Sequence, residues 1–411
     1  MSKKKKTPKL LAGYTHHNKV RLVHGGNDYF TTLVQMIDQA QSVIHLQTYI
    51  YEGDETGLMV SEALIRAAHR KVQVYVLLDG YASQDLSKQI IKEWRAAGIR
   101  FRWFWPLFRS RKFYFGRRMH HKVTVIDASY GLAGGVNISD RYNDIDGQKA
   151  WLDRALFVEG EAALKLHIIC RDMWTKAYWK KDGGRKEKFQ WLPGIIPTEE
   201  CLVRVRRNDW VQGENQISKS YLEMFRNAHH HITILSSYFL PGSIFRRNMT
   251  MAARRGVNIR LIVGGISDVK ISRLAEQYMY RWLFRNKIEV YEYQDTILHG
   301  KLAVYDGEWV TNGSYNVNKI SAYASVELNM DVRNSGFAAK VEQELDEIID
   351  HHCVRMTPEN FHHPLYKQFL QWGAFQTIRI LFFLFTFYFR QEKGASSPST
   401  PHSIRQPAKI S

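Results

Sequence analysis

Residues 120–137, HHKVTVIDASYGLAGGVN, return 179 positions later as residues 299–316, HGKLAVYDGEWVTNGSYN. Four chemically distinctive positions match in register, and their pairs are His120 with His299, Lys122 with Lys301, Asp127 with Asp306, and Asn137 with Asn316. A single His-x-Lys on a strand is a weak signal, because most such patterns mark only a polar strand edge. Two copies of His-x-Lys-x4-Asp-x6-Gly-(Gly/Ser)-x-Asn in one register indicate an internal duplication that carries a duplicated chemical site.

Strand periodicity assigns these positions to different faces. Side chains alternate along a strand, so His120 and Lys122 point to the same side. Asp127 lies an odd number of residues from both, and we expect it to anchor the strand or the next turn from behind. The Gly-Gly and Gly-Ser pairs permit a sharp turn close to a ligand, which returns Asn137 to the pocket as a hydrogen-bond donor. The second copy has the same parity.

Two such sites related by a pseudo-twofold axis predict a phosphate site. The lysine ammonium and asparagine amide groups would hold the non-bridging oxygens as charge grows in the transition state. One neutral imidazole can attack phosphorus and form a covalent phosphohistidine. The other, protonated, gives its proton to the leaving alcohol and then takes one from the incoming alcohol or water. The lysines supply the positive charge, so we expect no metal and no other cofactor.

Other histidines form runs that invite a zinc interpretation. They are HHH at 229–231 and HH at 351–352 and 362–363. None stands beside the spaced carboxylate or cysteine partners that a zinc site needs. We expect a polar helix end for the first run and solvated loops for the other two.

The chain has 411 residues, a formal net charge of +18 and a sequence pI near 9.6. That length suits two ordinary domains or one fused pair, and the charge favours an anionic partner such as nucleic acid or acidic lipid headgroups. Cys170, Cys201 and Cys353 are widely spaced, which favours reduced thiols in a cytosolic setting. No apolar run follows the basic start MSKKKKTPKL, so we do not expect a secretory signal there.

Strand and helix signals alternate through both halves, which predicts an α/β layer fold. SVIHLQTYIY at 42–51 and VQVYVLLDG at 72–80 have the character of buried strands, and GLMVSEALIRAAHRK at 57–71 is an amphipathic helix. From residue 200 the same order returns. The predicted segments are a basic N-terminal arm (1–18), a first half (19–181), a linker rich in Gly, Pro and charge (182–199), a second half (200–370), an aromatic membrane-interface segment (371–393) and a disordered tail (394–411).

The aromatic segment includes AFQTIRILFFLFTFYFR at 374–390, where only Ile380 to Phe389 is free of charge and amide. Crossing a bilayer takes about twenty apolar residues. A helix lying in the membrane interface, with Arg379 and Arg390 at headgroup level, suits the excess of phenylalanine. The alternative is a C-terminal helix packed on the domain, and the sequence leaves it open.

The doubled motif resembles the hallmark of the phospholipase D superfamily, and it is complete in both copies. The similarity extends over roughly residues 19–390. Stretches such as NKVRLVHGGNDYF, LQTYIYEGDETG and RRMHHKVTVID look like the short bacterial cardiolipin synthases of the B type. The resemblance implies two phospholipase D-type α/β/α sandwich domains with pseudo-twofold symmetry and an active site at their interface.

The resemblance also implies a reaction. A phosphatidyl group would pass from phosphatidylglycerol to a histidine and release glycerol. A second phosphatidylglycerol would then accept it to give cardiolipin, with phosphatidylethanolamine or free glycerol as alternative acceptors. Several relatives use the first histidine as nucleophile, which gives that role to His120 and general acid and base catalysis to His299, although the symmetry of the motifs leaves the assignment open.

Relatives also carry an acid after each motif that orients the histidine of the opposite half. By that analogy Glu327 would hold His120 and Asp153 would hold His299. The alternative is that both are ordinary strand-end acids.

A basic, aromatic insert, LFRSRKFYFGRRM at 107–119, leads into the first motif and has no counterpart before the second motif. Given the resemblance, we expect it to hold anionic headgroups at the pocket entrance while its aromatic side chains enter the interface. The candidate headgroup residues are Arg109, Arg111, Lys112, Arg117 and Arg118, with Arg379 in the C-terminal segment.

The leading hypothesis is a peripheral phosphatidyltransferase at the cytoplasmic face of the cell membrane, with an anionic phospholipid surface as its partner. A phosphodiesterase that uses water, on phospholipid or nucleic acid, would share the same site. DNA binding does not need a Phe-rich end, so we expect no nucleic-acid partner. A non-catalytic binding scaffold is the third hypothesis, and the intact histidines and lysines of both copies argue against it. The sequence predicts no oligomeric state.

Overall fold

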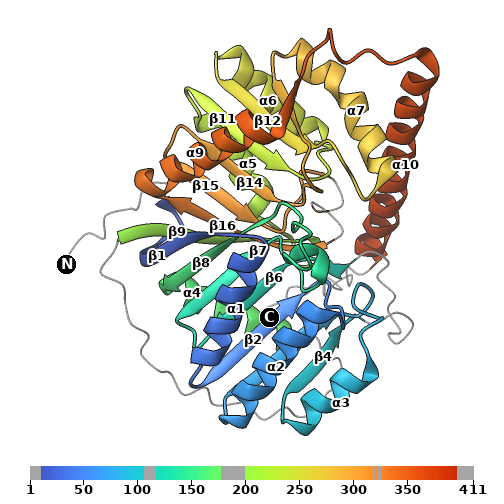
Figure 1. The fold of residues 1–411 in the computed structure, drawn as a ribbon. Coiled ribbons are helices and arrows are strands. Elements are labelled where there is room, and N and C mark those ends of the chain that lie inside the picture. Colours follow the sequence, from blue (N-terminus) through green and yellow to red (C-terminus); the bar gives the residue numbers. More distant parts are fainter. Residues whose placement is uncertain (1–10, 106–116, 177–199, 319–320, 322–324, 396–411) are drawn as a thin grey trace, which may run out of the picture.

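The computed structural model describes residues 11–105, 117–176, 200–318, 321 and 325–395. The predicted linker at 182–199, most of the arm at 1–18 and nearly all of the tail at 394–411 lie outside these residues. The described chain forms two halves with the same order of elements (Figure 1).

The first half alternates strands and helices as the sequence predicts. Its strands are β1 (Thr15–His24), β2 (Val43–Thr48), β3 (Gln73–Asp79), β4 (Arg100–Phe104), β5 (Arg118–Met119), β6 (Lys122–Ile126), β7 (Tyr130–Gly134) and β8 (Arg154–Gly160), and its helices are α1 (Asn27–Gln39), α2 (Glu55–His69), α3 (Lys88–Ala96) and α4 (Glu161–Lys176). The first strand begins at Thr15, inside the predicted arm.

The second half repeats this order and then extends it. Its strands are β9 (Glu200–Asp209), β10 (Glu214–Asn215), β11 (His231–Ser236), β12 (Asn258–Gly264), β13 (Glu289–Tyr293), β14 (Lys301–Tyr305), β15 (Trp309–Gly313), β16 (Ser325–Arg333) and β17 (Cys353–Met356), and its helices are α5 (Gln216–Asn227), α6 (Ser243–Arg254), α7 (Lys270–Arg285), α9 (Ser335–His352) and α10 (Leu365–Ala395). The histidines at 351–352 end α9, so the prediction of a solvated loop there was wrong.

The two sheets have matching strand orders. The first runs β4-β3-β2-β6-β7-β8-β1, with β2, β3 and β4 parallel and the remaining pairs antiparallel. The second runs β13-β12-β11-β14-β15-β16-β9, with β17 beyond β13 at its edge. Strands β1 and β9 pair antiparallel and join the sheets. The pseudo-twofold axis that relates the two halves therefore lies between these two strands.

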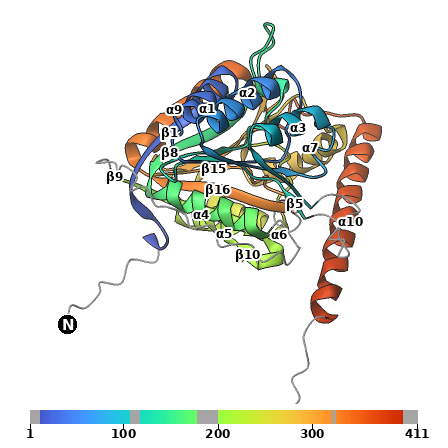
Figure 2. The ribbon, with the colours of Figure 1, turned by 90° about the horizontal axis from the view of Figure 1, so that it is seen from below.

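Helices cover both faces of each sheet (Figure 2). In the first half, α1, α2 and α3 enclose one hydrophobic core, and α4 covers the opposite face. In the second half, α5, α6 and α7 enclose a core on one face, and α9 packs on the other. The core beneath α4 also includes side chains of β9 and β16, so the halves share apolar contacts. This arrangement confirms the predicted pair of α/β/α sandwich domains.

Helix α10 packs along α7 at the side of the second half (Figure 1). It begins at Leu365, before the predicted start of the aromatic segment at residue 371. Within the part of the chain that the structure describes, no helix is both long and apolar enough to cross a bilayer.

Candidate active site

Backbone contacts between the halves fix both motif histidines. The N–H groups of His120 and His121 donate to the carbonyl of Val326, at 3.0 and 3.1 Å, where β5 pairs with β16. In the second half, the N–H groups of His299 and Gly300 both donate to a single first-half carbonyl at 2.8 Å, which belongs to Leu152. Each histidine therefore enters the site from one half but takes its backbone position from the other.

The acids cross between the halves in the same way. His120 Nδ1 lies 2.9 Å from Glu327 Oε2, and His299 Nδ1 lies 2.6 Å from Asp153 Oδ2. Both carboxylates are fully buried, whereas the histidine side chains retain 16% and 8% exposure. Because each acid holds Nδ1, the Nε2 atom of each ring is the one left for a reacting group.

The protonation of these pairs follows from burial and neighbouring charge. Burial lowers the pKa of both His120 and His299, which favours neutral imidazoles. Burial alone would raise the pKa of Asp153, but the charge of Lys301 and the contact with His299 lower it below its usual range. The pKa of Glu327 is lowered in the same way, mainly by His120. The two acids are therefore carboxylates at neutral pH.

The second residue of each Gly-(Gly/Ser) pair abuts the acid of its own half. A Cβ atom at Gly135 would lie 2.3 Å from Asp153 Oδ1, so only glycine leaves room for that carboxylate. At the matching position, Ser314 donates its hydroxyl to Glu327, which also accepts from Ser325 Oγ at 2.6 Å. The sequence predicts that the backbone approaches a ligand at these two positions. In the structure, the residues at these positions lie against the carboxylates that hold the histidines.

The two motif lysines are almost completely buried and share one electrostatic environment. Lys122 Nζ donates to the carbonyl of His120 at 2.6 Å, and Lys301 Nζ donates to that of His299. Burial and the charge of Lys301 lower the pKa of Lys122 to about 7. Burial also lowers the pKa of Lys301 to about 8, against the attraction of Asp153. A bound anion beside these lysines would stabilise their ammonium forms.

The motif asparagines are buried beside this centre. Asn137 Oδ1 accepts from the backbone N–H of Ile50 at 3.1 Å, and its Nδ2 donates to the Tyr142 hydroxyl at 2.9 Å. Asn316 Oδ1 accepts from Ser237 Oγ at 2.8 Å. These bonds fix both side chains, and Asn137 in turn positions Tyr142 against the site.

The motif aspartates lie away from the histidines. Asp127 accepts three backbone N–H groups, from residues 41–43, at 2.8–2.9 Å. Asp306 accepts those of residues 229–231 at 2.7–2.9 Å. These contacts tie β2 to β6 and β11 to β14. Strand parity predicts this anchoring position, behind the strand, for both aspartates.

Aromatic side chains that sequence reasoning missed enclose the histidines. The Tyr49 ring lies 4.9 Å from the His120 ring, and Lys122 Nζ lies 5.1 Å from the centre of the Tyr49 ring. Around His299, the rings of Tyr142 and Trp151 lie at 5.2 and 6.0 Å. Tyr49 lies near the carboxyl end of the strand predicted at 42–51 and directly follows β2, where site residues of α/β sheets gather, so its position carried a usable signal.

The basic insert is only partly described, because Arg109, Arg111 and Lys112 lie outside the described residues. Arg117 is buried, and its guanidinium pairs with Asp209 at 2.7 Å, so it already has an acidic partner in the interior. Arg118 is partly exposed and lies 3.7 Å from the carboxylate of Asp79.

Comparison with known proteins identifies the family. A family model described as "Cardiolipin synthase, PLD-like domain" matches residues 33–154 and 221–349. The chain is 34% identical over 355 residues to cardiolipin synthase B of Escherichia coli (strain K12), covering 84% of each chain. It is 31% identical over 406 residues to cardiolipin synthase B of Salmonella typhi, covering 97% of this chain and 95% of that relative.

A solved structure supports the fold independently. Phosphatidylserine synthase of Haemophilus influenzae Rd KW20 superposes with a TM-score of 0.69, covering 90% of this chain and 97% of that one, at 15% sequence identity. The resemblance predicted from the doubled motif is confirmed: this chain belongs to the cardiolipin synthase family of phospholipase D-like phosphatidyltransferases.

Proposed function

We propose that the chain is a cardiolipin synthase that moves a phosphatidyl group from one phosphatidylglycerol to another through a phosphohistidine, with release of glycerol. The observation that carries this proposal is the crossed orientation of the histidines. Each ring is held at Nδ1 by a buried carboxylate from the opposite half, beside two buried lysines. This constellation provides a nucleophile, a proton carrier and positive charge for phosphoryl oxygens.

Charge balance explains how two similar histidines take different roles. Lys122 and Lys301 oppose Asp153 and Glu327, so the buried charges cancel when both lysines are protonated. A phosphodiester adds one negative charge, and a proton on one imidazole restores neutrality. Substrate binding therefore favours one neutral and one protonated ring, which is the state that attack and leaving-group protonation require.

The proposed reaction has two matched steps. In the first, His120 Nε2 attacks phosphorus, the bond from phosphorus to the glycerol oxygen breaks, and His299 gives its proton to that oxygen. In the second, His299 takes the proton of a hydroxyl on the second phosphatidylglycerol, whose oxygen attacks phosphorus as the N–P bond breaks. The nucleophile is restored and cardiolipin leaves. The assignment of His120 as nucleophile rests on the relatives.

Helix α10 supports a peripheral position on a phospholipid membrane, with the cytoplasmic face as the proposed side. One face of the helix packs on α7, where the rings of Phe375 and Tyr278 lie 4.9 Å apart. Its other face exposes large apolar side chains, among them Leu365, Tyr366, Phe369, Leu370, Trp372, Ile380 and Leu381. A patch of this kind marks an interaction surface. The helix thus packs on the domain and also presents an apolar face.

Product analysis tests the proposal. Vesicles of phosphatidylglycerol alone should yield cardiolipin and glycerol in equal amounts. Adding phosphatidylethanolamine or excess glycerol to parallel samples identifies the acceptors that compete. Release of phosphatidic acid without cardiolipin would show that water is the acceptor and would replace the synthase with a phosphodiesterase. Cleavage of an oligonucleotide with no lipid turnover would establish the nuclease alternative.

A further inference from the structure

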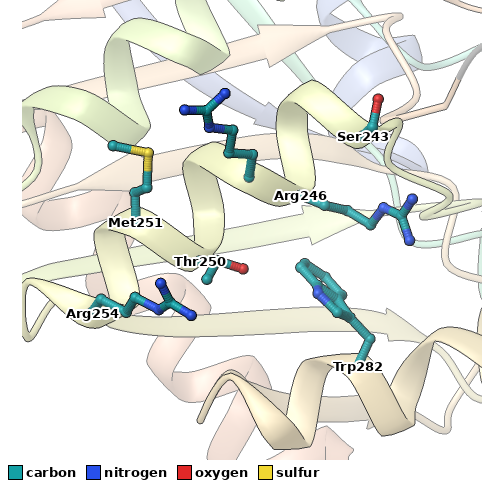
Figure 3. Close-up of a pocket in the computed structure, with 7 residues that line it drawn as sticks. Ser243, Arg246, Thr250, Met251, Arg254 and Trp282 are labelled. Atoms are coloured by element: carbon teal, nitrogen blue, oxygen red, sulfur yellow. The ribbon is translucent and has the colours of Figure 1, made fainter.

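A basic groove lies between α6 and α7 on the outer surface of the second half. It encloses about 480 Å3, and none of the motif residues lines it. Its lining residues are Ser243, Arg246, Arg247, Thr250, Met251, Arg254 and Trp282 (Figure 3). The arginines come from α6 and the tryptophan from α7, which forms the opposite wall.

Three arginines in this groove have no acidic partner in the part of the chain that the structure describes. Arg246, Thr250 and Arg254 are spaced by four residues along α6 and share one face, and Arg247 lies on the adjoining face. Within the described residues, none of the three arginines forms an ion pair, and Arg246 Nε is buried without a hydrogen-bond partner. Clustered like charges repel, so this arrangement is most stable when an anion lies among them.

Other arginines of the second half are used differently. Arg255, directly after α6, donates to the carbonyls that end α5. Arg260 pairs with Asp346 at 2.7 Å, and Arg273 pairs with Glu292. The arginines of the groove are therefore distinguished by the absence of structural partners within the described chain.

Trp282 connects the groove to the apolar helix. Its side chain packs with the core beneath α6 and with the small cluster that seats α10 on α7, including Ala374, Phe375 and Ile378. The rim of the groove carries Met251, which is 49% exposed. An arginine groove beside an exposed apolar helix matches a membrane surface, where phosphates lie a few ångströms above the acyl chains and tryptophan favours the boundary.

We propose that this groove binds the phosphate headgroup of an anionic phospholipid that remains in the membrane. Guanidinium groups bind phosphate oxygens through paired N–H donors. With a headgroup in the groove and the exposed face of α10 in the interface, the second half would contact the bilayer at two adjoining places. This lipid is distinct from the substrate at the histidines, so the inference extends the proposed function without assigning another role to its site.

The test uses the full chain and a triple substitution, R246Q/R247Q/R254Q. The matched control, K88Q/K92Q/R95Q, removes the same charge from exposed positions of α3 in the other half. Binding to vesicles of phosphatidylglycerol and of phosphatidylcholine is measured by sedimentation. Each surface cation near an anionic membrane contributes about a fivefold gain in affinity, so the triple variant should bind phosphatidylglycerol vesicles about 100-fold more weakly. The control should stay within about threefold of the unchanged protein.

Turnover separates this groove from the catalytic site. Both triple variants should turn over short-chain phosphatidylglycerol at the normal rate when it is dispersed below its micelle concentration. Unchanged binding of the R246Q/R247Q/R254Q protein to anionic vesicles would overturn the proposal. The proposal would also be overturned if this variant bound vesicles normally but lost affinity for inorganic phosphate or for an oligonucleotide. The groove would then hold a free anion or nucleic acid.

A charge-conserving variant keeps the test decisive if the glutamine variant does not fold. R246K/R247K/R254K retains the charge but removes the planar fork that pairs with phosphate. It should lose about tenfold in affinity for phosphatidylglycerol vesicles if headgroups bind in the groove. Full affinity in the lysine variant would show that only general surface charge matters and would reject a built headgroup site.

Discussion

His299 Nδ1 lies 2.6 Å from Asp153 Oδ2, although 146 residues separate them along the chain. His120 makes the equivalent contact with Glu327 across 207 residues. Each half therefore carries a histidine that it cannot orient alone. Because both contacts reach across the interface between the halves, a small shift between the two sheets would disturb both rings at once.

The Asp153 carboxylate should control the tautomer and orientation of His299. Asp153→Asn keeps the size of the side chain but removes its charge, so the imidazolium form loses its stabilising partner. We expect kcat to fall by about 10²–10⁴-fold with little change in KM, by analogy with acid–histidine pairs in hydrolases. Asp172→Asn, at an exposed acid, is the matched control. A normal kcat in Asp153→Asn would remove that acid from the proposed mechanism.

The two histidines should respond differently to the quality of the leaving group. His120→Ala removes the proposed nucleophile, so turnover should be lost with every substrate. His299→Ala removes the acid that protonates glycerol, so it should still release p-nitrophenol, which needs no protonation, from a p-nitrophenyl ester of phosphatidic acid in a single burst. Rapid-mix absorbance measures that burst. The reverse pattern would exchange the two roles.

Anion affinity should fall as the pH rises above 8. The pKa values of Lys122 and Lys301, about 7 and about 8, mean that above pH 8 Lys122 is largely neutral and Lys301 is more than half neutral. A phosphodiester needs the ammonium forms, so binding must take up protons, and its dissociation constant should rise about tenfold per pH unit for each lysine that must regain one. Dimethyl phosphate keeps a constant charge, and calorimetry in two buffers reports the proton uptake. Constant affinity from pH 6 to 9 would contradict these lowered values.

Asp127 should contribute to stability and not to chemistry. Asp127→Ala leaves three backbone N–H groups at the start of β2 without their acceptor, which should lower the free energy of unfolding by about 2–4 kcal/mol. Urea denaturation measures this loss, and kcat at a temperature where the variant remains folded should stay within about threefold. Asp127→Asn keeps one of the two acceptor oxygens, so its free energy of unfolding should lie between those of the unchanged protein and Asp127→Ala. A large loss of kcat in a stable variant would instead indicate a direct catalytic role for Asp127.

The exposed face of α10 should carry membrane affinity. Replacing Tyr366, Phe369 and Trp372 with serine removes aromatic surface while leaving the side that packs on α7. If each ring contributes about 1 kcal/mol on insertion, vesicle binding should weaken by about 100-fold. Serine at three other exposed apolar positions, Leu58, Ile168 and Val354, is the control. Equal losses in both variants would refute a specific role for α10.

The sequence predicts the architecture well because the signals are local and occur twice. The apolar runs that become β2 and β3 have few alternatives to buried strands, and their counterparts β11 and β12 repeat the pattern. The crossed acid–histidine pairs came from the family resemblance. Spacing alone does not show which strand end will meet which histidine when the halves fold together.

Other features depend on partners that are remote in sequence. Arg117 resembled a surface residue because it stands in a basic insert, but Asp209 lies 92 residues away and pairs with it in the interior. The spacing of Arg246 and Arg254, eight residues apart on α6, is visible in the sequence, whereas their position opposite Trp282 is not. The exposed face of α10 begins at Leu365 because tertiary packing, and not the longest apolar run, determines which side remains uncovered.

The difference between Gly135 and Ser314 bears on how a duplicated enzyme evolves. In a dimer of two identical chains, both copies of the site would have the same acid and the same residue packed against it. Fusion into one polypeptide removes that constraint, and here one copy combines a short acid with glycine while the other combines a long acid with a serine donor. Each acid and the residue packed against it must therefore change together. Exchanging only Asp153 and Glu327 should abolish turnover, whereas exchanging Gly135 and Ser314 as well should preserve it. In the proposed mechanism, such divergence would allow one imidazole to specialise in attack and the other in proton transfer.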